Sequence, residues 1–198
     1  MPSIRSHNHT LQAENGVRLV PLDDSHLPLL YRWNTDMEVL YWVEAEDLTE
    51  PYTREQVRGI YEHVSANAFC FLIEQDGVPV GDCWLQKMNL PEILAAYPRR
   101  TDLRRIDYCI GEKSYWGKGI GTAMLKALLE FAFLEQKCDV IYIMVEDYNQ
   151  RSRKLAERAG FRLESRIPAA ESQKASYSLR YVQTRYEYLQ KNALKSFF

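Results

Sequence analysis

A glycine-rich turn at residues 115–122 constrains this chain more than any other stretch of its sequence. The turn reads Tyr-Trp-Gly-Lys-Gly-Ile-Gly-Thr and leads into a long amphipathic segment. Because its glycines stand at alternate positions, consecutive backbone N–H groups can point at one anion, and the start of a helix adds a partial positive charge. Lys118 adds a full charge. The turn therefore predicts a phosphate-binding site, with an unliganded turn as the alternative, since short glycine motifs are weak signals.

The spacing of the glycines excludes two common nucleotide-binding loops. A Walker A loop needs Ser or Thr after Gly-Lys, but Gly119 follows Lys118, and Glu112 stands where the first Gly is required. A dinucleotide-binding fingerprint needs a third Gly where the chain has Thr122. The remaining pattern, Gly-x-Gly-x-Gly at the opening of a helix, fits a pyrophosphate group that is held without a metal.

Length and composition are those of an ordinary globular chain. The 198 residues carry a formal net charge of −2, and 46% of them are apolar. This length predicts one domain over residues 1–198, with residues 1–16 as a flexible N-terminal segment. The near-neutral charge predicts no nucleic-acid partner. No stretch is apolar enough to span a bilayer and residues 1–16 lack the apolar core of a signal peptide, so we expect no membrane partner.

The four cysteines are scattered and form no Cys-x-x-Cys pair; they are Cys70, Cys83, Cys109 and Cys138. Each stands in an apolar context, which is typical of reduced, buried thiols and predicts a cytoplasmic location. The histidines form no cluster with metal-ligand spacing, so we expect no metal site.

Hydrophobic periodicity predicts a mixed α+β fold, in which helices pack on a central, mostly antiparallel sheet. The predicted strands cover residues 17–20, 69–74, 78–88, 104–110, 140–145, 161–167 and 175–184. The predicted helices run from the cap at Asp23 to Met37, from the cap at Thr53 to about Asn67, and over 122–136, 149–158 and 185–198. Residues 44–51 and 89–102 are predicted to be irregular.

Three segments together resemble the GCN5-related N-acetyltransferase (GNAT) superfamily. The strand–turn–helix unit at 106–131 is similar to its acetyl-coenzyme A motif. The run Val145-x-x-x-Asn149-x-x-Ser152, which ends in Gly160-Phe161, is similar to its second cofactor segment. The likeness extends from about residue 17 to residue 184, and it implies the GNAT fold, a mostly antiparallel sheet with helices on both faces.

Within the superfamily, the likeness is greatest to aminoglycoside 6′-N-acetyltransferases. The similar stretches are Leu30–Trp33, Tyr41-Trp42, Ile106–Tyr108, Ile110–Glu112, Tyr115–Thr122 and Val182–Arg185. The resemblance implies acetyl-coenzyme A as donor, coenzyme A as product, and a small-molecule primary amine as acceptor. It implies no metal. Monomer and homodimer both stay open.

The resemblance also implies which residues bind the donor. The pyrophosphate would lie on the backbone of Trp116, Gly117, Lys118, Gly119, Ile120, Gly121 and Thr122. Strands 104–110 and 140–145 would be parallel neighbours that diverge, so the pantetheine arm could pair with Cys109 and Ile110, where a backbone N–H could also stabilise the oxyanion. Asn149 could bond the arm or serve as a helix N-cap, and Ser152 could face the cofactor or the helix surface.

Acetyl transfer requires a neutral amine, so a carboxylate must accept a proton from the ammonium group. The resemblance points to Asp107, which interrupts an apolar strand. A structural ion pair of Asp107 with Arg104 or Arg105 is the alternative. Many relatives have Tyr, thought to protonate the leaving thiolate, where this chain has Ala156; Tyr148 and Tyr115 are possible substitutes.

The acceptor is expected to be an aminoglycoside or a similar small polyamine, bound by an aromatic and acidic segment. The candidate residues are Trp42, Glu44, Glu46 and Asp47. A solvated acidic loop is the alternative, and the cluster Arg99, Arg100, Arg104 and Arg105 opposes a cationic acceptor. Ser152 and Ala156 resemble members that acetylate protein N-termini, which is a second possible function. A noncatalytic acyl-coenzyme A binding module is a third.

Overall fold

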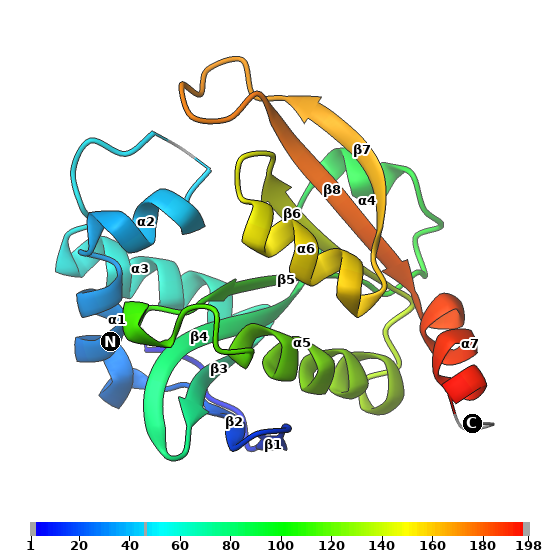
Figure 1. Ribbon diagram of the computed structural model, residues 1–198, viewed down its shortest axis with the longest axis horizontal. Helices are drawn as coiled ribbons and strands as arrows, with labels where there is room; N and C mark the ends of the chain where they lie inside the picture. The colour runs from blue at the N-terminus through cyan, green and yellow to red at the C-terminus, as the bar shows by residue number, and fades with distance from the viewer. Residues whose placement is uncertain (1–2, 46, 196–198) are drawn as a thin grey trace.

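A mixed sheet forms the centre of the molecule in the computed structural model, which describes residues 3–45 and 47–195 (Figure 1). Within these residues the sheet has eight strands in the spatial order β1-β2-β3-β4-β5-β6-β8-β7. The strands are β1 Leu11–Gln12, β2 Val17–Pro21, β3 Ala68–Gln75, β4 Val78–Lys87, β5 Leu103–Cys109, β6 Val140–Glu146, β7 Arg162–Pro168 and β8 Tyr177–Thr184. Neighbouring strands are antiparallel except β5 and β6.

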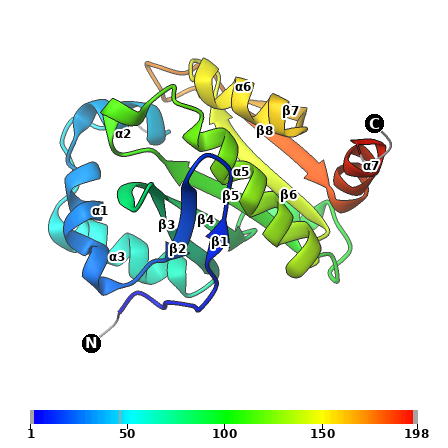
Figure 2. The same ribbon diagram turned by 60° about the horizontal axis from the view of Figure 1, so that its bottom comes forward.

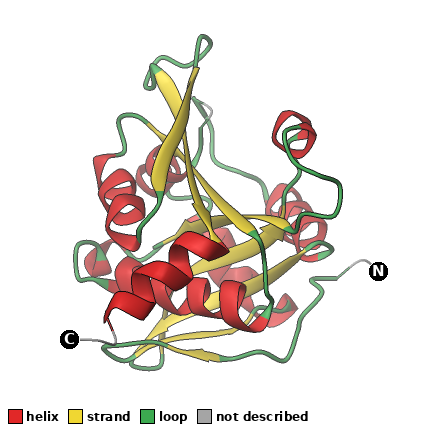
Figure 3. Ribbon diagram, turned by 90° about the vertical axis from the view of Figure 1, so that its right-hand side faces the viewer, coloured by secondary structure: helices red, strands yellow, loops and turns green. Residues whose placement is uncertain are grey.

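Helices cover both faces of this sheet, as the sequence predicted (Figure 3). They are α1 Leu27–Trp33, α2 Met37–Val43, α3 Arg54–Ser65, α4 Pro91–Ala95, α5 Ile120–Glu130, α6 Gln150–Ala159 and α7 Arg185–Lys195. A π-helical turn at Phe131–Glu135 continues α5. No helix in the described part of the chain is long and apolar enough to cross a membrane.

Alternation along β3 divides the core into two layers. Phe71 and Ile73 pack with the apolar face of α5. Cys70 and Leu72 pack with Trp33 of α1 and with the buried face of α3. Because successive strand residues point to opposite faces, one apolar strand supplies both layers. Figure 2 brings β1 and β2 forward, where they extend the sheet on the far side of β3 from β4.

Local signals in the sequence account for several element boundaries. Thr53 and Gln56 form the predicted capping box at the start of α3: the Gln56 N–H donates to Thr53 Oγ1 (3.2 Å), and the Thr53 N–H donates to Gln56 Oε1 (2.8 Å). Asp76 and Gly77 have φ values of 50° and 80°, as a tight two-residue hairpin turn requires. The predicted hairpin of β3 and β4 is therefore confirmed.

Two expectations about helices were wrong. The predicted helix from Asp23 to Met37 is interrupted after α1, because the polar side chains that follow bond back to the main chain. Asn34 Nδ2 donates to the Leu30 carbonyl (2.7 Å), and Asp36 then caps α2. In addition, residues 89–102 are not wholly irregular, since α4 lies within them and starts at a proline, which suits the first helical turn.

The described part of the N-terminal segment packs against α3 and β3. Ile4 is buried, the Arg5 N–H donates to Ser65 Oγ (2.9 Å), and the His7 ring bonds to the Cys70 carbonyl (3.0 Å). Residues 3–16, expected to be flexible, thus contribute contacts to the core, and β1 extends the sheet by one strand.

The parallel pairing of β5 and β6 stops early. Only 103–105 pairs with 140–142, and the remaining residues of both strands have no partner across this gap. The divergence of these two strands was predicted and is confirmed. It leaves the backbone edge of residues 106–109 without a β6 neighbour, in the middle of the sheet.

Two glycines allow other groups to pack closely around the end of β5. A Cβ at Gly81 would lie 2.1 Å from the Cys109 carbonyl oxygen, and a Cβ at Gly111 would lie 2.1 Å from the Trp33 indole. Trp33 Nε1 also donates to Glu112 Oε1 (2.8 Å). Helix α1 is thereby fixed to the segment that joins β5 to the glycine turn.

We expect Gly111→Ala to destabilise the protein by about 1–3 kcal/mol, because a buried indole ring must move to admit the methyl group. Gly59→Ala is the matched control: Gly59 is exposed on α3, and an added Cβ there has nothing within 4 Å. The control should be neutral or stabilise by up to about 1 kcal/mol. Chemical denaturation of both variants measures the difference, and equal stability of Gly111→Ala and the wild type would contradict this packing.

Candidate active site

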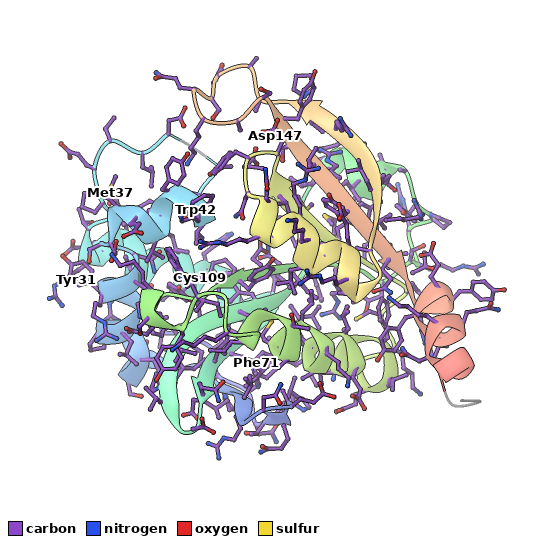
Figure 4. The ribbon with its side chains drawn as sticks, viewed as in Figure 1. Tyr31, Met37, Trp42, Phe71, Cys109 and Asp147 are labelled. Carbon is purple, nitrogen blue, oxygen red and sulfur yellow. The ribbon has the colours of Figure 1, made fainter. Side chains whose placement is uncertain are left out.

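A cavity of about 790 Å³ opens where β5 and β6 diverge. Every residue from Arg105 to Ile110 lines it, and so do residues 143–146. Because neighbouring strand residues point to opposite faces, this unbroken lining indicates that the cavity reaches both faces of the sheet. Figure 4 shows Cys109 at the end of β5 and Trp42 at the end of α2 nearest α6; both line the cavity.

The predicted phosphate-binding turn forms one wall of this cavity. Gly117 and Gly119 have φ values of +76° and +83°, which L side chains rarely adopt, and an added Cβ at either would have nothing within 4 Å. Open space therefore lies directly above the backbone at the start of α5. The lining residues of the turn are Tyr115, Trp116, Gly117, Gly119, Ile120, Gly121 and Thr122. Lys118 is not among them, and its ammonium lies 5.1 Å from the centre of the Tyr115 ring.

Asn149 and Ser152 line the cavity, but their side chains bond within the protein. Asn149 Oδ1 accepts from the Ser152 N–H (3.1 Å), which makes Asn149 the N-cap of α6. Its Nδ2 donates to the Trp42 carbonyl (2.9 Å), so the amide links α6 to α2. Ser152 Oγ lies 2.5 Å from the Tyr108 hydroxyl. Asn149 is therefore an N-cap, as the sequence allowed, and the contact of Asn149 and Ser152 with a cofactor stays a prediction.

Part of the backbone edge predicted to bind the pantetheine arm already makes a hydrogen bond within the protein. The Trp116 indole donates to the Ile110 carbonyl (2.6 Å) and ties the glycine turn to the end of β5. The Cys109 thiol lies at the same place, and burial with the nearby Asp82 and Glu44 raises its pKa well above the usual value. The thiol is therefore a neutral group in the cavity wall and not a thiolate nucleophile.

A basic stripe on α6 was missed at the sequence level. Arg151, Lys154 and Arg158 all line the cavity, and their spacing of three and four residues places them on one helix face. The Arg151 guanidinium lies between two rings, 5.7 Å from the centre of Trp42 and 5.5 Å from that of Trp116. The spacing was visible in the sequence, but only the fold shows that this face points toward the glycine turn.

Asp107 lines the cavity and forms a bidentate ion pair. Arg105 Nη2 donates to Oδ1 (2.7 Å) and Arg105 Nε donates to Oδ2 (2.8 Å). Of the two arginines named in the sequence-based alternative, Arg105 is the partner. Arg104 instead pairs with Asp102 (2.6 Å).

The remaining arginines of the cluster do not face the cavity. Arg99 and Arg100 are exposed, and neither belongs to its lining. Of the four arginines counted against a cationic acceptor, only Arg105 contributes to the cavity, and Asp107 pairs with it.

The structure adds a second carboxyl group, Asp82 on β4. Its side chain is 3% exposed, and its Oδ1 has no hydrogen-bond partner among the described residues. Burial raises its pKa from 3.8 to about 7; the Tyr61 phenol and the Trp84 indole oppose this shift, and the charge of Asp107 adds to it. One signal in the sequence marks this residue, namely a charged side chain inside an apolar strand.

The predicted acceptor residues do not all reach the cavity. Trp42 and Glu44 line it. Asp47 does not: its carboxylate accepts hydrogen bonds from the Gln173 N–H and the Ser172 hydroxyl. Glu46 lies outside the described residues. These acidic residues are close together in the chain, but the fold directs Asp47 toward the β7–β8 loop.

The two tyrosines considered as thiolate acids differ in placement. Tyr115 lines the cavity, whereas the Tyr148 hydroxyl donates to the Tyr41 carbonyl (2.5 Å) and Tyr148 is outside the lining. Burial raises the pKa of Tyr108 to about 12, so its hydroxyl stays protonated beside Ser152. No cluster of three or more metal-ligating side chains occurs within the described residues.

The model of an acetyltransferase (GNAT) domain matches residues 17–162. The chain belongs to the GNAT family of acetyltransferases. The expected GNAT fold and the expected enzyme class are thereby confirmed.

Individual GNAT proteins similar to this chain act on different acceptors. It is 22% identical over 170 residues to an aminoglycoside N(6′)-acetyltransferase type 1 from Klebsiella pneumoniae, a match that covers 80% of both chains. The solved spermidine N-acetyltransferase from Vibrio cholerae in complex with CoA and spermine has a TM-score of 0.72 at 16% identity, covering 88% of this chain and 98% of that one. RimL, a ribosomal alpha-N-protein acetyltransferase in complex with coenzyme A, has a TM-score of 0.70 at 18% identity, covering 89% and 98%.

We expect the burial of Asp82 to appear in the pH dependence of stability. Because its pKa is raised in the folded state, the folded protein binds the proton more tightly, and stability falls as pH rises from about 4 to about 7. At 1.36 kcal/mol per pKa unit, this loss is on the order of 4 kcal/mol. Asp82→Asn removes the titrating group. The melting temperature of this variant, measured relative to that of the wild type, should therefore rise by roughly 5–10 °C from pH 5 to pH 8.

Asp102→Asn is the matched control for this measurement, since the Asp102 carboxylate is partly exposed and outside the cavity lining. Its melting temperature should follow that of the wild type across the same pH range. A gap between Asp82→Asn and the wild type that is constant from pH 5 to pH 8 would contradict the raised pKa.

Proposed function

We propose that this chain transfers the acetyl group of acetyl-coenzyme A to a primary amine of a small polycationic acceptor, and that the 6′-amino group of an aminoglycoside is the best candidate. On this proposal the whole chain is one acetyltransferase domain. Coenzyme A leaves as the second product. The similarity to an aminoglycoside N(6′)-acetyltransferase supports the acceptor class.

The separation of charges inside the cavity is the observation that carries this proposal. Three cations of the cavity lining, Arg151, Lys154 and Arg158, come from α6, and Arg151 lies 5.5 Å from the centre of the Trp116 ring in the glycine turn. Of the lining carboxyl groups, Asp82 and Asp107 come from β4 and β5, Glu44 follows α2, and Glu146 ends β6. One part of the cavity therefore suits a phosphorylated donor and another suits an ammonium group, as acetyl transfer from coenzyme A to an amine requires.

The donor would enter from the α5 and α6 side. We propose that its pyrophosphate binds the backbone at 116–122, where the glycines leave open space, and that Arg151, Lys154 and Arg158 supply the countercharge that Lys118 was expected to give. The pantetheine arm would pair with the free edge of β5 toward Cys109 and Ile110. Asn149 and Ser152 would border the arm. Acetyl-coenzyme A fits these residues, since the space that a Cβ at Gly117 or Gly119 would enter holds no other group within 4 Å.

The acceptor would lie on the side of α1, α2 and α3. We propose that Trp42 and Glu44 border it and that Asp107, held by Arg105, attracts its ammonium group. The β7–β8 loop lies beside this part of the lining, because Lys174 Nζ donates to the Glu44 carbonyl (2.8 Å). Asp47 and Glu46 would at most add charge at the rim.

Acetylation of a protein N-terminus is the second candidate. The likeness to RimL and the pair Ser152 and Ala156, with Ala156 fully buried in α6, favour it. The same panel of acceptors decides between the two functions. The four cysteines are free thiols, which supports the cytoplasmic location we propose. With an aminoglycoside acceptor, the enzyme would act in antibiotic resistance.

Release of free thiol from acetyl-coenzyme A tests the proposal directly. The acceptors are kanamycin and other aminoglycosides, the polyamines spermidine and spermine, and peptides with free N-termini. We expect the highest kcat/KM with an aminoglycoside. A peptide as best acceptor would favour the second candidate, and no release with any amine would refute acetyl transfer to amines.

Asp107→Asn should lower kcat/KM for the amine at least tenfold, because the cavity loses the charge that attracts the ammonium group, while the coenzyme A Kd stays within about twofold. Asp102→Asn is the matched control: its carboxylate also pairs with an arginine two residues away but does not line the cavity. The control should keep wild-type kinetics. Equal kcat/KM in Asp107→Asn and the wild type would remove Asp107 from the site.

A further inference from the structure

Asp82 is a carboxyl group of the cavity to which sequence and family likeness assign no role. It lies directly opposite Cys109 in the antiparallel pair of β4 and β5. Directly opposite residues share one face of the sheet, so Asp82 and Cys109 lie on the same face as Trp84 and Asp107, which form another such pair. Asp82 on β4 therefore lies opposite the end of β5, at a point where β5 no longer pairs with β6.

The Asp82 carboxyl is buried and incompletely bonded. Its Oδ1 and the neighbouring Trp84 indole N–H make no hydrogen bond of normal geometry among the described residues, and the Tyr61 phenol and the Trp84 indole lie close enough to oppose the rise of the Asp82 pKa. Buried polar atoms in native proteins almost always have partners, so an orphaned carboxyl oxygen in a cavity wall calls for a ligand or a catalytic role. A hydrogen-bond donor that enters the cavity, such as the ammonium group of an acceptor, would supply the missing partner of Asp82 Oδ1.

Asp107, the other carboxyl group on this face, is fully hydrogen-bonded. Both oxygens of Asp107 already accept hydrogen bonds from Arg105. Its charge is matched by a guanidinium group, whereas no described cation is paired with Asp82. Two carboxyl groups in one cavity whose surroundings differ in this way are suited to different tasks.

We propose that Asp82 accepts the proton of the acceptor ammonium group and that the Asp107–Arg105 pair positions this group beside the thioester. This inference rests on the proposed acetyl transfer. The ammonium N–H bond breaks and the proton passes to the Asp82 carboxylate. The neutral amine then attacks the acetyl carbonyl carbon, and the C–S bond breaks with its electron pair on the coenzyme A sulfur. The nitrogen loses a second proton, which the thiolate takes up, and Asp82 later returns its proton to water.

The groups that face Asp82 leave it as the titrating group of this wall. Tyr61 from α3, Cys70 from β3 and Cys109 from β5 all have pKa values raised by burial, so they stay neutral. Cys83, next to it on β4, is also held neutral by burial. The charged groups nearby are Asp107 with its partner Arg105, and Glu44 beside Cys109. Burial raises the pKa of Asp82 to about 7, where proton uptake from an amine is effective.

The pH profile of kcat/KM for the amine, at saturating acetyl-coenzyme A, tests this assignment. Kanamycin and spermidine serve as separate acceptors. If a group of the enzyme causes the fall of kcat/KM at low pH, which is the acid limb of the profile, the midpoint of this fall is the same with both. The wild type should lose activity below a midpoint near pH 7. Asp82→Asn should lower kcat at least 100-fold and lose this acid limb, while the coenzyme A Kd stays within about twofold. Asp107→Asn should keep the limb and raise KM.

Cys83→Ala is the matched control on β4, since Cys83 points to the opposite face and packs in the α5 layer of the core. It should keep the wild-type limb. If Asp82→Asn fails to bind coenzyme A, Asp82→Glu replaces it and should retain an acid limb because the carboxyl group remains.

An active wild type without an acid limb between pH 6 and pH 8 overturns the inference, as does an Asp82→Asn variant that keeps the limb. Loss of the limb in Asp107→Asn with retention in Asp82→Asn would assign the proton to Asp107. If no amine causes the wild type to release thiol, the proposed function is overturned as well. The two failures are therefore distinguishable.

Discussion

The divergence of β5 and β6 is the constraint on which the site depends. A sheet normally satisfies every backbone group of its inner strands, yet here the parallel pairing ends at Arg105 and Tyr142. The sheet tolerates this opening because the end of β5 is held from other directions. Gly81 admits the Cys109 carbonyl, and Trp33 packs on Gly111. The Trp116 indole bonds to the Ile110 carbonyl and holds the glycine turn next to the opening, so the cavity and its glycine-rich wall arise from one arrangement.

On the proposed function, the charged groups of the lining divide the cavity between two substrates. The basic stripe of α6 lies beside the start of α5. There the glycines leave the backbone without side chains, and the N-terminus of the helix carries a partial positive charge. The carboxyl groups of β4 and β5 lie on the face covered by α1 and α3. Asp107 is neutralised by Arg105, whereas Asp82 is buried without a countercharge. On the proposed function, donor recognition and proton acceptance therefore use separate elements of a single fold.

Much of this could be predicted from local patterns. Strand alternation, the Asp76-Gly77 turn and the Thr53 capping box place most elements within one or two residues. Alternation alone also favours Arg105 over Arg104 as partner of Asp107, since residues two apart share a face. Asp82 could not be placed in the site, because its position depends on pairing with Cys109, 27 positions along the chain. The contact of Asn149 with Trp42 is equally nonlocal, and so is the diversion of Asp47 to the β7–β8 loop.

A crystal structure with bound coenzyme A tests the central claim most directly, namely that the opening between β5 and β6 holds the donor. The account predicts phosphate oxygens within hydrogen-bond distance of the backbone N–H groups at 117–121, and the thiol between β5 and β6 close to Cys109 and Asp82. A coenzyme A molecule whose phosphates lie away from the glycine turn, or whose pantetheine arm runs outside the opening between the two strands, would contradict it.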